Sequence, residues 1–313
     1  MGNTRQRRER RSNPRSTVQD CPEDCTAICA EKAKVERFQD EANIADAMYD
    51  PIGERNVPGY TEITDPDELA KLDLSLGDLH PNRADLLNMG MDPAKVARVK
   101  ESGFRAGVFQ NNETGDYAIG FKGTTFTSVE DWKNNAQQGI SSRSDYYTRA
   151  KSIGRRASNK AGSGSVGDVK YIGHSLGGGL ASAAAHTGGS PATTFNSAGL
   201  HGFNRSWFNA PPIDAVRVNG EVLTALQGAV PLLAPDAVGT PYKVKAPSNV
   251  ASTMERADLN GWDAVIPGRA VYKYGKAAVA RSVELHGMDA VKDALTERHS
   301  ALAGKAAAGG CSC

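Results

Sequence analysis

A serine between two glycines, at the junction of an apolar run and a small-residue run, is the most chemically informative feature of this sequence. The segment Gly173-His174-Ser175-Leu176-Gly177 has the pattern Gly-x-Ser-x-Gly. β-forming residues precede it, and the Gly/Ala-rich run that follows predicts a tightly packed helix. A sharp strand-to-helix turn presents the serine hydroxyl above a sheet, and the glycines let neighbouring backbones come close. The pattern therefore predicts that Ser175 is a nucleophile and that the Leu176 N–H faces a developing oxyanion.

Two further residues could complete the chemistry of this serine. A serine needs a base to take its proton and an acid to hold that base. In α/β-hydrolases these residues follow one another in the order Ser, Asp or Glu, His. His286 fits as the base, because it lies after Ser175 on a predicted short loop between a strand-like run and a helix. Glu221 directly follows a predicted strand and is the favoured acid, with Asp236 as the alternative and Asp263 behind it.

A second oxyanion donor is expected upstream, at the end of a predicted hairpin. Residues 104–110 and 117–121 are predicted to form two strands joined by a turn rich in Asn and Gly. The return strand runs into a Gly-Thr corner, where Thr124 could offer its N–H and its hydroxyl. Such a corner at the carboxyl end of a strand is a suitable position for an oxyanion donor in an open α/β sheet.

The elements around these residues predict an α/β fold with a mostly parallel sheet. Helical periodicity covers residues 22–48 and 144–159, and a further helix is expected over 269–282. Short strands are expected at 192–196 and 215–218. The order strand, helix, strand implies right-handed crossovers and a ligand site at the carboxyl ends of the strands.

The remaining segments are expected to form one domain with two tails. Residues 1–19 are basic and predicted to be disordered, residues 20–300 to form a single domain, and residues 301–313 to be a flexible tail. Residues 50–91, rich in Pro and Gly, predict a loop-rich stretch. The sequence leaves open whether the long Pro/Gly-rich excursion over 222–268 forms a lid.

Charge and hydropathy exclude some classes of partner. The formal net charge of the 313 residues is +1, which gives no reason to expect a nucleic-acid partner. No apolar run reaches about 18 residues, so no transmembrane helix is expected. No apolar core follows the basic N-terminal residues, so we expect synthesis in the cytoplasm without a secretory signal peptide.

The five cysteines lie only near the two ends of the chain. Cys21, Cys25 and Cys29 are spaced to form one stripe on a helix, for which ordinary small-residue packing is the favoured interpretation. A zinc site would need a fourth ligand from elsewhere, and redox or intermolecular pairing is the other alternative. The absence of cysteine from the presumed core argues against a disulfide-built secreted fold. Cys311-Ser-Cys313 resembles a prenylated ending, although an unmodified flexible tail is favoured.

Several motifs together resemble the class 3 lipase family of α/β-hydrolases. Gly-Phe-Lys-Gly-Thr at 120–124 resembles the family's oxyanion segment, and Asp131-Trp132 resembles its Asp-Trp. The elbow at 173–178 matches closely, whereas Asn196-Ser197-Ala198-Gly199 matches loosely. Lys122 replaces the usual Arg of the first motif. Glu221 stands at the position where the family has an Asp as the catalytic acid.

The resemblance implies a serine esterase that acts on lipid carboxyl esters without a metal or organic cofactor. The chain also resembles bacterial lipase effectors delivered by type VI secretion, which attack phospholipids of a target membrane. This implies a membrane-surface substrate and possible immunity or delivery partners. The alternatives are a thioesterase or acyltransferase of the same fold, a catalytically inactive lipase-like binding module, and a membrane-tethering protein that depends on the two tails.

Overall fold

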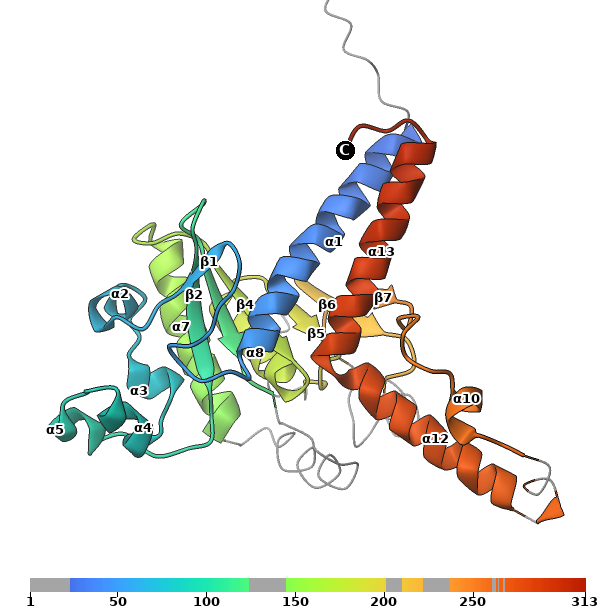
Figure 1. Ribbon diagram of the computed structural model, residues 1–313. Helices are drawn as coiled ribbons and strands as arrows, with labels where there is room; N and C mark the ends of the chain where they lie inside the picture. Colours follow the sequence, from blue (N-terminus) through green and yellow to red (C-terminus); the bar gives the residue numbers. More distant parts are fainter. Residues whose placement is uncertain are drawn as a thin grey trace, which may run out of the picture.

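A mixed β-sheet forms the centre of the molecule (Figure 1). The computed structural model describes residues 23–123, 145–200, 210–221, 237–260, 263, 265–266 and 268–313. Within these residues seven strands pair in sequence order, antiparallel from β1 to β3 and parallel from β3 to β7. The strands are β1 Tyr60–Glu62, β2 Ala106–Asn111, β3 Tyr117–Phe121, β4 Val169–His174, β5 Ala192–Phe195, β6 Ile213–Val218 and β7 Thr240–Val244.

The α/β fold expected from the sequence is confirmed, including the hairpin and the parallel strands that follow it. The sequence analysis did not predict two of the strands, β1 and β7. β1 is only 3 residues long, and β7 contains Pro241. Proline cannot donate a ladder hydrogen bond and is therefore found on edge strands. β1 and β7 are the two edge strands of this sheet, and an edge strand can form from a weak sequence pattern.

Helices cover both faces of the sheet. On one face lie α7 (Asp145–Gly162) and α8 (Leu176–Gly188); on the other lie α1 (Glu23–Ala47) and α13 (Met288–Ala308). Successive side chains of a strand point to opposite faces. Ile119 of β3 accordingly belongs to the core beneath α7 and α8, and its neighbour Ala118 to the core beneath α1 and α13.

The remaining described helices lie outside these layers. The stretch expected to be loop-rich instead holds three short helices, and one more follows it: α2 Pro66–Lys71, α3 Leu76–Leu79, α4 Arg83–Asn88 and α5 Pro93–Val96. Near the C-terminus, α10 (Thr253–Ala257) packs against α12 (Arg269–His286). None of the described helices is both long enough and apolar enough to cross a bilayer.

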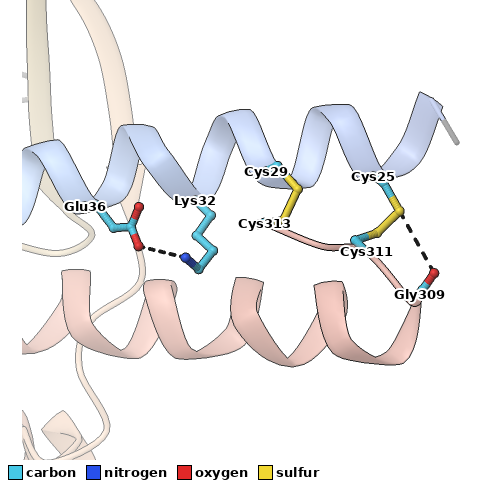
Figure 2. The surroundings of a disulfide bond; sticks show 7 residues. All are labelled: Cys25, Cys29, Lys32, Glu36, Gly309, Cys311 and Cys313. Atoms are coloured by element: carbon cyan, nitrogen blue, oxygen red, sulfur yellow. Dashed lines mark hydrogen bonds and ion pairs between the residues drawn. A yellow bond between two sulfur atoms is a disulfide. The ribbon is translucent and has the colours of Figure 1, made fainter. Parts of the chain in front are cut away.

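Two disulfides join the ends of the chain, which corrects our interpretation of the cysteines. Cys25 bonds to Cys311 and Cys29 to Cys313, at the outer end of the antiparallel pair α1 and α13 (Figure 2). Bonded thiols are not available for prenylation or metal binding. The tail also differs from the expected flexible segment, because α13 continues to Ala308 and the residues beyond it are held by these bonds. Cys21 and the basic segment 1–19 lie outside the described residues.

The pairing has a simple geometric basis. Two residues four apart in a helix are separated by about 6 Å along its axis, and two residues of extended chain span about 6.6 Å. A Cys-x-Cys segment beside a helix can therefore reach two cysteines spaced at i and i+4. The sequence showed both spacings, but it did not show that α13 runs back along α1 and brings the two ends together.

Candidate active site

Ser175 lies on the sharp turn between β4 and α8, as the sequence analysis expected. Its backbone angles are φ 57° and ψ −124°, a conformation that non-glycine residues rarely adopt. The surrounding structure holds this conformation: the Ser175 N–H donates to the carbonyl of Phe195, and its carbonyl accepts from the N–H groups of Gly178 and Ala198. Ser175 is therefore fixed between β4, α8 and the segment after β5.

The elbow glycines are required by close backbone contacts. A Cβ atom on Gly177 would lie 2.1 Å from the carbonyl oxygen of Phe121, and one on Gly173 would lie 2.2 Å from the carbonyl oxygen of Gly177. Both distances are far below a normal contact. These glycines let α8 begin directly against the end of β3, which brings Gly123 beside Ser175 (a Cβ on Gly123 would lie 3.3 Å from the Ser175 Cβ).

His286 and Glu221 meet in the interior. The Nδ1 atom of His286 lies 2.8 Å from Oε2 of Glu221, and both residues are buried. Glu221 follows β6, at the carboxyl edge of the sheet. His286 is the last residue of α12, so the loop that the sequence predicted for it is in fact the end of a helix. Nδ1 bound to a carboxylate leaves Nε2 as the nitrogen that can exchange a proton with a substrate or nucleophile.

Asp263, one of the two competing acids, lies far from His286. Asp263 binds Lys273 at 2.9 Å and Arg269 at 2.8 Å. Lys273 lies 13 residues before His286 in α12, which corresponds to about 20 Å along the helix axis. Asp263 is therefore tied to the far end of α12. The alternative acid Asp236, the oxyanion candidate Thr124 and the Asp131-Trp132 pair lie outside the described residues.

Leu176 is the first residue of α8, with Ser175 at the N-cap position. N–H groups in the first turn of a helix have no partner within that helix, and the helix dipole favours negative charge there. The Leu176 N–H is thus suitably located for an oxyanion that forms on a carbonyl bonded to Ser175. Gly123, the described residue immediately before Thr124, lies against the same serine.

A buried clamp holds the backbone of His286. Nε2 of His174 donates to the His286 carbonyl at 2.7 Å, and the Asn196 amide donates to the carbonyls of His286 and Leu285 at 3.0 and 3.1 Å. The Asn196 side-chain oxygen in turn accepts from the Val218 N–H at 2.9 Å. The clamp thereby connects the ends of β4, β5 and β6 to the C-terminal end of α12 and supplies hydrogen bonds to its last carbonyls.

The protonation state of His174 follows from its partners. Burial, with a smaller contribution from nearby His286, lowers the pKa of His174 to about 3. The neutral ring carries its proton on Nε2, because a carbonyl can only accept. Nδ1 must then accept from the hydroxyl of Tyr49, 2.8 Å away. Burial raises the pKa of Tyr49, which keeps this donor protonated.

The structure brings Glu221 and His286 together, as expected for an acid and a base, but the sequence analysis missed the residues that hold them. Asn196 appeared only as part of a loosely matching motif, and Tyr49 was not singled out at all. One signal was available: Asn196 is the last residue of a predicted strand, at the carboxyl edge of the sheet near Ser175 in the predicted order. Among the described residues, no group of three His, Cys, Asp or Glu side chains is placed to hold a metal ion.

Comparison with known proteins gives consistent matches. Residues 40–255 match the family described as Phospholipase-like, Tle-like phospholipase domain. The extracellular phospholipase A1 of Serratia liquefaciens is 31% identical over 225 residues, 68% of this chain and 62% of that protein. The chain thus spans less than two thirds of the length of this relative.

Solved lipase structures also match. A triacylglycerol lipase from Penicillium expansum aligns with 14% identity and a TM-score of 0.42, over 69% of this chain and 81% of the lipase. The Rhizomucor miehei lipase aligns with 14% identity and a TM-score of 0.34, over 60% of this chain and 71% of the lipase.

Proposed function

Because the chain belongs to the Tle-like phospholipase family, we propose that it is a serine esterase that hydrolyses carboxyl esters of phospholipids. The observation that carries the proposal is the buried hydrogen bond between His286 and Glu221. The His286 ring lies 4.9 Å from that of His174, the residue directly before the serine on the strained strand-to-helix turn. This combination is typical of nucleophilic acyl transfer. The name of the Serratia liquefaciens relative, a phospholipase A1, supports a phospholipid substrate.

The proposed mechanism has two steps. In the first, the Ser175 hydroxyl oxygen bonds to the ester carbonyl carbon while Nε2 of His286 takes the hydroxyl proton. The N–H groups of Leu176 and Thr124 stabilise the resulting oxyanion. The carbon–oxygen ester bond then breaks, and the lysophospholipid leaves with the proton from His286.

In the second step, water attacks the acyl group on Ser175 and gives its proton to His286. The fatty acid departs as Ser175 regains that proton. Glu221 stays ionised throughout, orients the His286 ring and balances its transient positive charge. No metal or organic cofactor takes part in this scheme.

The disulfides support a place of action outside a reducing cytosol. Such bonds form and persist in oxidising compartments, and the relative from Serratia liquefaciens is named as extracellular. We propose that the protein is exported as a lipase effector, and that delivery and immunity proteins recognise it. Mass spectrometry of the exported protein, with and without reduction, tests this: fully reduced cysteines after export would contradict it.

The decisive experiment compares intact protein with Ser175→Ala on phospholipid and triglyceride vesicles. We expect fatty-acid release from phospholipid by the intact protein only, with both proteins equally folded by circular dichroism. Faster release from triglyceride would indicate a lipase instead. Transfer to an added alcohol or thioester cleavage would favour the acyltransferase or thioesterase alternative. No release, together with no labelling of Ser175 by a fluorophosphonate, would favour the inactive binding module.

A further inference from the structure

The helix α12 exposes an apolar face on the side opposite its contact with α10. Val271 is 77% and Tyr272 70% exposed, and Val279 is also exposed. Val271 and Val279 are eight residues apart and lie on one face of the helix, with Tyr272 beside them. Ala277, on the opposite face, is buried, in agreement with the packing of α12 against α10. A surface helix normally buries its apolar face, so this arrangement is reversed.

The apolar surface continues to the outer end of α12. Val265, just before the helix, is 70% exposed, and Ile266 is exposed as well. Figure 1 shows α12 extending from the body as an arm, on the other side of the molecule from the disulfide-linked end of α1 and α13. We call residues 265–266 and 268–286 the α12 arm. Large exposed apolar surfaces of this kind mark contact sites for partners or membranes.

The charge of the α12 arm indicates what kind of surface it binds. The helix carries four basic residues and one acidic residue, Glu284. Three cationic side chains, from Arg256, Lys273 and Lys276, line a cavity of about 450 Å³ between α10 and α12. Arg256 and Lys273 have acidic partners, whereas Lys276 makes no ion pair with any described residue. Apolar side chains combined with excess positive charge complement an anionic lipid surface. Two copies of the arm would instead repel each other.

We propose that the α12 arm docks the protein on the surface of an anionic phospholipid bilayer. Val271, Tyr272 and Val279 enter the interfacial region, and Lys276 contacts headgroup phosphates. The helix is about 27 Å long and ends at His286, so docking brings the bilayer to the edge of the sheet that holds Ser175. This inference rests on the proposed phospholipid esterase function, for which it names the surface that holds the protein on the membrane, separate from the active site.

Binding can be measured separately from hydrolysis. The Ser175→Ala protein is sedimented with vesicles of equal parts phosphatidylglycerol and phosphatidylcholine, and with vesicles of phosphatidylcholine alone. We expect binding to the mixed vesicles to be at least tenfold tighter. Replacing Val271, Tyr272 and Val279 by Asn should weaken it at least tenfold. Lys276→Glu should weaken binding to the mixed vesicles roughly tenfold and leave phosphatidylcholine binding unchanged.

The matched control changes exposed apolar residues on another helix. Leu87 and Met89, at the end of α4, are 46% and 38% exposed, and their replacement by Asn should leave vesicle binding within twofold. In the active protein, the triple Asn variant should keep its rate on a soluble monomeric ester and lose activity on vesicles. An intact protein that binds vesicles but cleaves no ester would contradict the proposed function while supporting the docking arm.

Three results would overturn the docking proposal. The first is equal vesicle binding by the parent and the triple Asn variant. The second is equal binding of the parent to the two kinds of vesicle. The third is a parent that is dimeric by light scattering without lipid while the triple Asn variant is monomeric, which would assign the apolar face to self-association.

Discussion

Replacing Asn196 distinguishes two explanations for an asparagine at this position: its backbone conformation and its side-chain hydrogen bonds. Its backbone has φ 41°, a region where Gly is favoured and Asn is tolerated better than most residues. Its side chain also clamps the last turn of α12 to the end of β6. If the backbone conformation is the reason, Asn196→Gly should be at least as stable as the parent. If the clamp is the reason, both Asn196→Gly and Asn196→Ala should be destabilised.

The structure gives the expected magnitude. Removing the amide takes a partner from the Leu285 carbonyl and from the Val218 N–H, whereas the His286 carbonyl keeps its bond from His174. A buried polar group that loses its partner costs about 1–3 kcal/mol. The two groups together therefore cost about 2–6 kcal/mol in the free energy of unfolding. Asn196→Ala adds roughly 1 kcal/mol for a Cβ in the left-handed region.

Urea denaturation followed by circular dichroism measures the loss, and Asp73→Gly is the control. Asp73 is exposed and has φ 58°, so its replacement by Gly should be neutral or stabilising. A looser His286 should also lower kcat by roughly 100-fold, the effect of a misplacement of about 1 Å, with little change in KM. Parental stability of Asn196→Gly would refute the clamp, and unchanged kcat would refute its role in positioning His286.

Three further predictions follow from the same structure. Glu221→Gln should lower kcat by about 10²–10⁴-fold with little change in folding, whereas Asp263→Asn should leave turnover unchanged; turnover of a soluble ester by both variants checks this, and equal losses would contradict the assignment of the acid. The pKa of His174 is lowered from 6.5 to about 3 on folding, so the unfolded state binds more protons between these values. Stability should be fully present above pH 6.5 and fall by up to about 5 kcal/mol as the pH decreases towards 3, and His174→Gln should flatten this acid transition in pH-dependent urea titrations. Removing either disulfide alone should cost about 2 kcal/mol in the free energy of unfolding, because the other still closes the long loop, whereas removing both should cost about 8 kcal/mol by loop-closure entropy. Losses that simply add in denaturation of the Cys-to-Ala variants would contradict this account.

Local sequence patterns predicted the elements that hold the candidate catalytic residues. The glycines around Ser175 reflect backbone contacts with β3 that no larger side chain permits. The position of Glu221 after a strand and the order of the three residues along the chain were also visible. Each of these signals depends on residues close together in the sequence, or on a rule about where strands end.

The features that were missed depend on contacts between distant segments. The clamp joins Asn196 to residues about 90 positions later in the chain. No local sequence pattern around Asn196 indicates these partners. His286 was placed on a loop because Val283 and Leu285 suggest a strand, whereas α12 continues to His286 and buries Leu285 in the core beneath α1 and α13. The cysteine pairs were separated by most of the chain, so spacing alone could not show that they face each other.

The two disulfides also give the protein an unusual covalent topology. Cys25 and Cys311 are 286 residues apart in the sequence, so nearly the whole chain is a closed ring. A single protease cut between them opens the ring but releases no fragment until a reductant is added. A closed ring also cannot pass end-first, in single file, through a narrow membrane pore. If the protein is exported as an extended chain, the cysteines must be reduced during passage, and the bonds form afterwards.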